Sequence, residues 1–267
     1  MILREGRIIR EVSMEDKANL TPEALAGMGL RSLELEAPDE AALPVLEESD
    51  EPMILRDFHL RYPGAEHAAV DFPELRFAVG EITAVTGSNG AGKTSFLNCL
   101  CGLEKRCKGK LEYKGKTFDH RALQKLCFMV MQDTGNQLFT ESVLDEVLIS
   151  LPKNTENEKE RAKEILKSLD LEPFLERHPQ SLSGGQKQRL AIACALASGR
   201  EVLLLDEPTS GLDYAHMMET AKLLKQLKEL GTTILVVTHD SELIHACCSR
   251  RFSISERRAF TLSQSLS

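Results

Sequence analysis

Apolar and polar positions along this chain predict short buried strands that alternate with helices. Four stretches are almost entirely apolar, as expected for strands covered on both faces: residues 82–85, 126–131, 202–205 and 233–237. Between them, apolar residues recur at helical spacing in three places: residues 95–100, 190–195 and 215–230. Strands that alternate with helices form parallel sheets. The pattern therefore predicts an α/β domain with a mainly parallel sheet core.

Two further regions depart from this alternation. Residues 54–60 alternate between apolar and polar, a second short strand is expected at residues 75–79, and residues 110–115 predict a hairpin. These strands predict an antiparallel β subdomain beside the parallel core. Residues 142–171 instead show helical periodicity, which predicts a helical lobe over about residues 140–185.

The first fifty residues differ in composition from the rest of the chain. They hold twelve acidic residues against five Arg or Lys, whereas the remaining body is close to neutral. Residues 33–52 combine three prolines with many acids, which is typical of a flexible, self-repelling linker. Residues 2–9 predict two short strands around a turn at Glu5 and Gly6. The globular domain is therefore expected over residues 53–267.

Composition and charge argue against several classes of protein. The net charge of −8, the aromatic content of 5% and the lack of Trp argue against a nucleic-acid partner. No stretch approaches the roughly 18 apolar residues that a membrane-spanning helix needs, so we expect a cytosolic chain. The seven cysteines include no C-x-x-C pair, which argues against a zinc site or a disulfide framework. Reduced, mostly buried thiols are expected instead.

The candidate chemistry begins with residues 87–94, which read Gly-Ser-Asn-Gly-Ala-Gly-Lys-Thr and fit the phosphate-loop pattern G-x-x-x-x-G-K-[S/T]. The loop lies between a predicted strand and a predicted helix, as the pattern requires. Its glycines let backbone N–H groups turn toward a phosphate, and the helix N-terminus adds partial positive charge. We expect Lys93 to reach the β- and γ-phosphates and the Thr94 hydroxyl to ligate Mg²⁺.

Further motifs lie along the rest of the chain. Residues 182–186 read Leu-Ser-Gly-Gly-Gln and open a predicted helix, the third apolar strand ends in Asp206 and Glu207, and the fourth is followed by His239. Ligands of parallel sheets bind at the carboxyl ends of the strands, so these groups are expected to meet the phosphate loop. With these motifs in this order, residues 53–255 resemble the ATP-binding-cassette (ABC) ATPases. The resemblance implies a P-loop NTPase fold of the ABC type.

The resemblance implies a role for individual residues. Glu207 matches the carboxylate that polarises water for attack on the γ-phosphate, and His239 matches the switch histidine that contacts this phosphate. Gln132 matches the glutamine that touches Mg²⁺ and the attacking water, and Asp206 matches the acid that holds Mg²⁺. Tyr62 matches the aromatic residue that stacks on adenine.

Sorted by role, the implied catalytic residues are Glu207, His239, Gln132 and Lys93. The implied ATP-binding residues are Tyr62, Ser88, Asn89, Gly90, Ala91, Gly92, Lys93, Thr94 and Ser95. The implied ligands of Mg²⁺ are Thr94, Gln132 and Asp206.

Other matched residues act on a different subunit in the resembled family. Ser183, Gly185 and Gln186 match signature residues that contact ATP bound to the opposite subunit, and Asp213 matches a residue at the dimer interface. The resemblance therefore implies a head-to-tail pair of ATPases, formed by two copies of this chain or by this chain and another ATPase. In that family ATP closes the pair and hydrolysis opens it.

A narrower resemblance lies in residues 132–139, Gln-Asp-Thr-Gly-Asn-Gln-Leu-Phe, and residues 142–147. This stretch is similar to the segment after the glutamine in ATPases of energy-coupling-factor (ECF) transporters. It implies an ATP-hydrolysing subunit of a membrane importer for a vitamin, a cofactor precursor or a metal ion, located peripherally at the cytoplasmic face of the cell membrane. Its partners are then a membrane coupling protein and a substrate-binding membrane protein. The alternative is a soluble ABC ATPase of translation or DNA repair.

Two details of this resemblance concern the ends of the domain and its surface. Leu138 and Phe139 form an apolar edge for a partner's helix, or they pack the helical lobe internally. Residues 2–9 are similar to the closing hairpin of such ATPase domains, which this chain repeats weakly over residues 252–262. Because some members of the family carry two ATPase domains, we expect residues 1–32 to be the tail of a preceding one.

Overall fold

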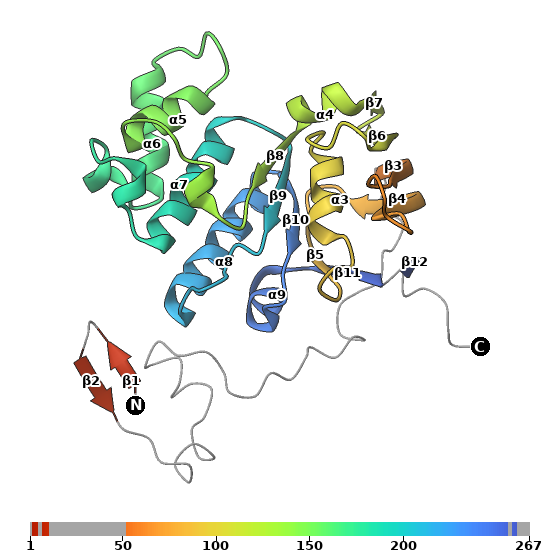
Figure 1. Ribbon diagram of the computed structural model, residues 1–267. Coiled ribbons are helices and arrows are strands. Elements are labelled where there is room, and N and C mark those ends of the chain that lie inside the picture. Colours follow the sequence, from red (N-terminus) through yellow and green to blue (C-terminus); the bar gives the residue numbers. More distant parts are fainter. Residues whose placement is uncertain (1, 5–6, 11–51, 256–257, 261–267) are drawn as a thin grey trace.

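The computed structural model describes residues 2–4, 7–10, 52–255 and 258–260. Its core is a six-stranded sheet that consists of β5 (Ile82–Thr86), β8 (Cys127–Val130), β9 (Val202–Asp206), β10 (Thr233–Val237), β11 (Arg250–Ser255) and β12 (Arg258–Phe260). The strand order is β12-β11-β5-β10-β9-β8 (Figure 1). Every neighbouring pair in this sheet is parallel except β11 with β12. The predicted α/β fold with a mainly parallel core is confirmed.

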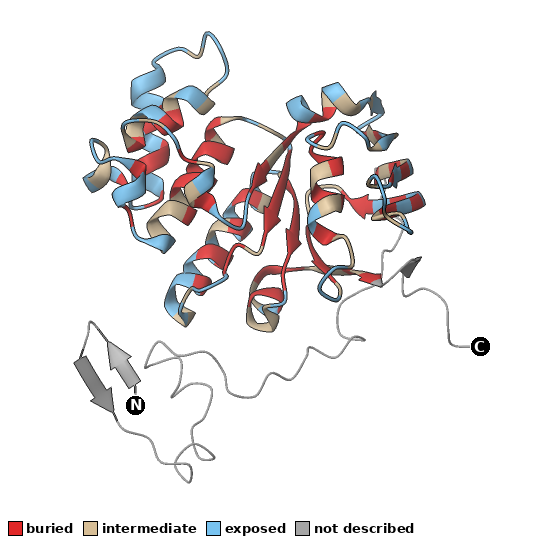
Figure 2. Cartoon of the chain, in the orientation of Figure 1, coloured by how far each residue is buried: buried red, intermediate tan, exposed pale blue. Residues whose placement is uncertain are grey.

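Strands β5, β9 and β10 are buried along their whole length, which explains their continuous apolar sequence. Successive residues of a strand point to opposite faces of the sheet. Leu235 and Val237 of β10 share an apolar cluster with α3 (Lys93–Leu100). Ile234 and Val236 share another with α8 (Tyr214–Glu229) and α9 (Ser241–Cys247). Helices thus cover both faces, and Figure 2 shows buried residues along the strands between them.

An antiparallel sheet forms the second layer of the domain. It consists of β3 (Pro52–Leu60), β4 (Val70–Ala78), β6 (Lys108–Tyr113) and β7 (Lys116–Phe118), in the order β4-β3-β6-β7. Four phenylalanines join this sheet to the parallel sheet through α3, with ring centroids 5.4 to 6.2 Å apart: Phe72, Phe77, Phe96 and Phe252. The packing fixes α3, which carries Lys93 and Thr94, against both sheets.

The strand expected at residues 75–79 starts earlier than predicted. β4 begins at Val70, and its alternation of buried and exposed residues is interrupted at Pro73 and Glu74. Opposite this interruption, Asp57 of β3 has a φ of 54°, and the pairing of β3 with β6 shifts register between Arg56 and His59. This local irregularity interrupts the period-two alternation in β4, so the sequence pattern did not predict the first half of the strand.

The apolar run at residues 126–131 is also not one strand. Leu126 is the last residue of α4 (His120–Leu126), and β8 covers only Cys127–Val130. Asp119 caps α4 by accepting hydrogen bonds from the N–H groups of Arg121 and Ala122. A buried helix end next to a buried strand has the same apolar appearance as a longer strand.

A helical lobe lies beside the parallel sheet (Figure 1). It consists of α5 (Val143–Ser150), α6 (Glu158–Ser168), part of α7 (Gly184–Ala197) and the short 3₁₀ helices η1 (Thr134–Asn136), η2 (Glu172–Phe174) and η3 (Pro179–Ser181). Ser142 caps α5 and Ser183 caps α7. The lobe extends beyond residue 185, because its apolar cluster includes four residues of α7: Leu190, Ala193, Cys194 and Ala197.

The remaining described segments agree with the sequence patterns. β1 (Ile2–Arg4) and β2 (Arg7–Arg10) form an antiparallel pair, as predicted for residues 2–9. The expected linker lies outside the described residues except for Pro52, and so does the rest of the expected tail after Arg10. All seven cysteines are free, and six of them are buried. In the part of the chain that the structure describes, no helix is long and apolar enough to cross a membrane.

Leu166 tests the packing of the helical lobe. Its side chain is 0% exposed, so Leu166→Ala should lower the free energy of unfolding by about 2–5 kcal/mol. The matched control Ile149→Ala removes a side chain that is 61% exposed and should change this free energy by less than about 0.5 kcal/mol. Urea titration followed by far-ultraviolet circular dichroism measures both. Equal losses in the two variants would contradict the described core of the lobe.

Candidate active site

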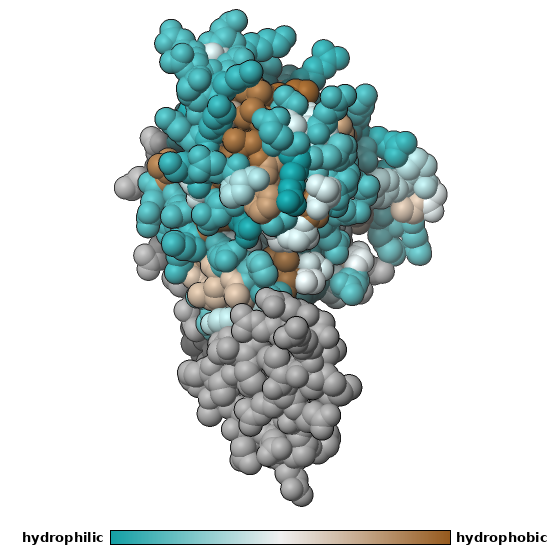
Figure 3. Space-filling view, turned by 90° about the vertical axis from the view of Figure 1, so that its left-hand side faces the viewer, coloured by the Kyte–Doolittle hydropathy of each residue, from teal (hydrophilic) through white to brown (hydrophobic). Residues whose placement is uncertain are grey.

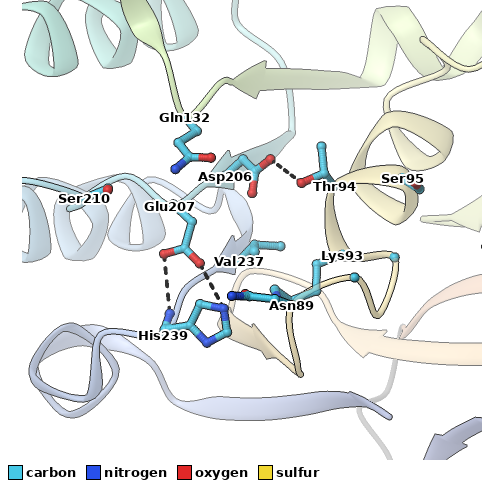
Figure 4. A pocket seen from close by; sticks show the side chains of 12 residues that line it. Asn89, Lys93, Thr94, Ser95, Gln132, Asp206, Glu207, Ser210, Val237 and His239 are labelled. Atoms are coloured by element: carbon cyan, nitrogen blue, oxygen red, sulfur yellow. Dashed lines mark hydrogen bonds and ion pairs between the residues drawn. The ribbon is translucent and has the colours of Figure 1, made fainter. Parts of the chain in front are cut away.

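The register of the parallel strands brings several loops to one edge of the sheet. Val85 of β5 and Asp206 of β9 both pair with Val237 of β10, and Val130 of β8 pairs with Leu205 of β9. The segments that follow these strands therefore meet where parallel sheets bind ligands. They form a cavity of about 510 Å³ (Figure 4), lined by Asn89, Gly90, Gly92, Lys93, Thr94, Ser95, Gln132, Asp206, Glu207, Ser210, Val237 and His239.

The phosphate loop has a backbone conformation that favours glycine. The φ angle is 148° at Gly87, 83° at Gly90 and 95° at Gly92. A Cβ atom on Gly92 would lie 2.2 Å from the carbonyl oxygen of Ala69, so only glycine fits this close approach of two backbones. α3 begins directly after Gly92, which provides no side-chain cap. The first N–H groups of α3 can therefore bind an anion in the cavity.

The two polar side chains that begin α3 have different contacts. Lys93 is 8% exposed, and its Nζ donates to the carbonyl oxygens of Gly87 at 2.8 Å and Ser88 at 2.9 Å. This ammonium group lies across the loop, where phosphate oxygens are stronger acceptors than neutral carbonyls. Thr94 Oγ1 donates to Asp206 Oδ2 at 2.8 Å. That bond joins the phosphate loop directly to the end of β9.

Glu207 follows β9 in an uncommon conformation. Its φ is 47°, and its N–H donates to the carbonyl oxygen of Val237 at 2.9 Å, which fixes the turn against β10. The carboxylate faces His239 (Figure 4): Oε1 lies 3.5 Å from Nε2, and Oε2 accepts from the His239 N–H at 3.4 Å. Burial raises the pKa of the Glu207 carboxyl, although the charge and the N–H of His239 oppose this rise.

The remaining residues predicted for the same ATP site are divided between the cavity and its surroundings. Gln132 lines the cavity from the segment that follows β8. Tyr62 lies outside the lining; its hydroxyl oxygen is 3.2 Å from Ser95 Oγ, and the residue packs against the core. Ser88 and Ala91 also lie outside the cavity lining. The carbonyl oxygen of Ser88 accepts a hydrogen bond from Lys93, and Ala91 packs against the core.

The signature residues lie away from the cavity lining. Ser183 and Gln186 form a capping box at the start of α7, in which each side chain bonds the backbone N–H of the other. Gly185 lies against His216, since a Cβ atom there would be 3.2 Å from the ring. Asp213 caps α8 and accepts from the N–H and Nδ1 of His216, and the backbone hydrogen bond lowers the pKa of its carboxyl. The structure thus separates these four residues from the cavity.

Val237 and Asp240 had no predicted role at the site, whereas Ser210 belongs to residues 210–213, which the family resemblance predicts to couple the two sites of a dimer. Ser210 and Val237 line the cavity, and Ser210 N–H donates to the carbonyl oxygen of Glu207 at 3.1 Å. Asp240 caps α9 and accepts from Thr209 Oγ1 at 2.7 Å. This bond ties the loop after Glu207 to the loop after β10. The position of Asp240 directly before a helix is a sequence signal for the cap, but no pattern indicates its bond to Thr209.

Comparisons with known proteins identify a family and several similar chains. The ABC transporter family profile matches residues 71–210. The energy-coupling factor transporter ATP-binding protein EcfA of Methanocaldococcus jannaschii is 37% identical over 199 residues, which is 71% of this chain and 70% of the relative. The structure of CbiO1 from Clostridium perfringens, described as part of the ABC transporter complex cbiONQ, has a TM-score of 0.69 and 32% identity. It covers 79% of this chain and 88% of that chain.

Other relatives are much longer than the matched region. An ABC transporter ATP-binding protein of Treponema denticola is 43% identical over 176 residues, which is 66% of this chain and 35% of the relative. A second match in Treponema denticola is 32% identical over 253 residues, which is 94% of this chain and 51% of the relative. The chain therefore spans about a third and about half of the length of these relatives.

The raised pKa of Glu207 predicts a pH-dependent effect on stability. Burial favours the neutral carboxyl, so the contribution of Glu207 is most favourable below the ordinary glutamate pKa and is lost as pH rises through the raised value. Glu207→Gln should therefore unfold at a higher temperature than the wild type at pH 7, and this difference should shrink toward pH 4. Calorimetry over this range, with the exposed Glu160→Gln as a control, measures the effect. A difference that grows as the pH falls would contradict the assignment.

Proposed function

The chain belongs to the ABC transporter family, whose ATPases hydrolyse ATP to power transport, and from this premise we propose that it is the ATP-hydrolysing subunit of a membrane importer. The observation that carries the proposal is the single cavity shared by Lys93, Gln132, Glu207 and His239. Lys93 begins α3, and the other three side chains come from the loops after β8, β9 and β10 at the same sheet edge. Together they provide a phosphate cradle, a base and groups that can orient water.

The proposed reaction is in-line attack of water on the γ-phosphate of ATP, which breaks the bond between the γ-phosphorus and the bridging oxygen and releases ADP and inorganic phosphate. Lys93 and the N–H groups at the start of α3 hold the phosphates. Glu207 polarises the water, and burial raises the pKa of this carboxylate, which makes it a stronger base. Gln132 orients the same water, while His239 contacts the γ-phosphate. Tyr62 lies beside Ser95 at the rim, where we assign its ring to the adenine.

The residues also fit a bound Mg²⁺. Thr94 Oγ1 and Asp206 Oδ2 lie 2.8 Å apart, and Gln132 lines the same cavity, so three hard oxygen donors face one region. We propose these three residues as its ligands, directly or through water. When bound, the cation neutralises charge on the β- and γ-phosphates.

We further propose that a second ATPase completes the site. Ser183 and Gly185 lie at the start of α7 but do not line the cavity beside their own phosphate loop. A helix N-terminus that is exposed in one chain can bind the γ-phosphate held by another. Head-to-tail pairing brings each signature turn to the opposite ATP, with Asp213 at the interface. ATP closes this pair, and hydrolysis opens it.

The proposed membrane partner contacts the helical lobe. Leu138 is buried in the lobe cluster, whereas Phe139 is 72% exposed and Ile149 is 61% exposed. Of the two predicted apolar neighbours, one packs internally and the other faces outward. Figure 3 shows apolar side chains gathered among polar ones on the side of the molecule that holds the lobe. We propose that a helix of a membrane coupling protein binds Phe139, as in helix-in-groove recognition.

The similarity to EcfA and to CbiO1 favours an ECF-type importer. In this proposal the chain is peripheral at the cytoplasmic face of the membrane, and a separate membrane protein binds the vitamin, cofactor precursor or metal ion. Affinity purification of the tagged chain from gently solubilised native membranes tests the assignment. We expect a membrane coupling protein and a second ATPase to purify with it. Ribosomal or DNA-repair proteins without a membrane subunit would contradict the importer assignment and support the soluble alternative.

Glu207→Gln tests the catalytic assignment. Loss of the general base should lower the rate of ATP hydrolysis about 10²- to 10⁴-fold, while ATP binding is retained. In ATP and Mg²⁺ the variant should then accumulate as a closed dimer, visible by light scattering after size-exclusion chromatography. Glu201→Gln, in which the altered acid precedes the opposite end of β9, is the matched control and should hydrolyse ATP normally. Unchanged hydrolysis by Glu207→Gln would contradict the proposed role.

A further inference from the structure

Residues 133–140, here called the connecting segment, run from the ATP cavity to the surface of the helical lobe. The segment follows Gln132, which lines the cavity, and includes Phe139, which is 72% exposed. Gln137 attaches it to the core: its Nε2 donates to the carbonyl oxygen of Met129 at 2.8 Å, and its Oε1 accepts from Met131 N–H at 3.1 Å. Phe139 therefore lies only two residues from an anchor on β8.

The first attachment of this segment to the lobe is made by Glu146 of α5. Glu146 is 3% exposed, and one of its oxygens, Oε2, accepts three hydrogen bonds from the segment. The donors are Phe139 N–H at 3.0 Å, Thr140 N–H at 2.8 Å and Thr140 Oγ1 at 2.7 Å. A buried carboxyl group is costly unless such donors satisfy it, so the contact strongly favours this geometry.

The second attachment links the segment to the signature helix. Gln180 of η3 donates from Nε2 to the carbonyl oxygens of Gly135 at 2.6 Å and Leu138 at 2.9 Å. Its Oε1 accepts from Lys187 Nζ at 3.0 Å. Lys187 lies in the first turn of α7, next to the signature residue Gln186. A continuous polar path therefore joins the signature turn to the residue that precedes Phe139.

We propose that Glu146 and Gln180 are positioning residues: Glu146 holds Phe139 on the helical lobe, and Gln180 transmits movement of the signature turn to it. This inference rests on the proposed function, because it gives Phe139 a partner and the signature turn a nucleotide to contact. Nucleotide on the opposite subunit then reaches Phe139 through Lys187 and Gln180.

Hydrogen exchange tests the contact made by Glu146. Glu146→Leu removes the acceptor of the Phe139 and Thr140 N–H groups, so exchange of these amides should become about tenfold faster. Glu146→Gln keeps an acceptor oxygen and should restore most of the protection. Asp145→Leu, at an exposed neighbouring acid, is the matched control and should leave both amides protected.

The same measurement reports whether the lobe stays folded. Amides of α6 must keep their wild-type exchange in Glu146→Leu for the local interpretation to hold. If they do not, Glu146→Asp replaces that variant, because it keeps the buried carboxylate but shortens its reach by one methylene; it should still speed exchange of the Phe139 and Thr140 amides. Wild-type exchange of the Phe139 and Thr140 amides in a folded variant would overturn the role of Glu146.

Fluorescence tests the role of Gln180. The chain contains no Trp, so Phe139→Trp introduces a single reporter at the proposed docking position. In a Glu207→Gln background, ATP and Mg²⁺ should change the emission and anisotropy of this Trp. Gln180→Leu should reduce that response at least about twofold, because its hydrogen bonds to the segment are lost. Gln180→Glu keeps an acceptor for Lys187 but lacks the amide N–H donors, and should reduce the response similarly.

Gln124→Leu is the matched control, because Gln124 also donates to a backbone carbonyl, that of Gly102 at 2.7 Å, but lies on α4. It should leave the Trp response intact. An undiminished response in Gln180→Leu would overturn the proposed path.

Binding of a fluorescent ATP analogue is measured in parallel. If no variant binds it, the proposed function fails, while hydrogen exchange still decides the contact made by Glu146.

Discussion

The shared register of β8, β9, β10 and β5 is the constraint on which the rest of the structure depends. Because these strands are parallel and paired almost without offset, Val85, Val130, Asp206 and Val237 all lie near one sheet edge. Asp206 is the last residue of β9, and other polar residues of the cavity lie one to four residues beyond a strand end, among them Gln132, Glu207, Ser210 and His239. Lys93, Thr94 and Ser95 begin α3, after the loop that follows β5. Burial of the strands on both faces holds the register, so the hydrophobic core also sets the geometry of the candidate site.

Two hydrogen bonds fix individual residues of the candidate site at this sheet edge. The bond from Thr94 to Asp206 joins α3 to β9, and the turn at Glu207 is fixed by its own N–H against β10. These contacts hold the carboxylate of Glu207 in a partly buried position, and this burial raises its pKa. A raised carboxyl pKa is common at groups that act as acids or bases, in keeping with the role proposed for Glu207.

The sequence predicted those parts that depend on local pattern. β5, β9 and β10 are continuous apolar strands because both faces are covered, and the phosphate loop is recognisable because its glycines and Lys93 lie within eight residues. The start of β4 was missed because Pro73 interrupts its alternation. Contacts such as Gln180 with Leu138 or Thr209 with Asp240 join residues 42 and 31 positions apart, and no local pattern encodes them.

The central claim is that one chain supplies the phosphate loop and another supplies the signature turn. Mixing two variants tests it most directly: Lys93→Ala, which removes the proposed phosphate contact, and Ser183→Arg, which blocks the signature turn. Each alone should hydrolyse ATP at a small fraction of the wild-type rate. If the pair consists of two copies of this chain, an equal mixture should recover roughly a quarter of that rate, because about half of randomly paired dimers then contain one intact composite site. A Ser183→Arg chain that hydrolyses ATP on its own as fast as the wild type would contradict the account.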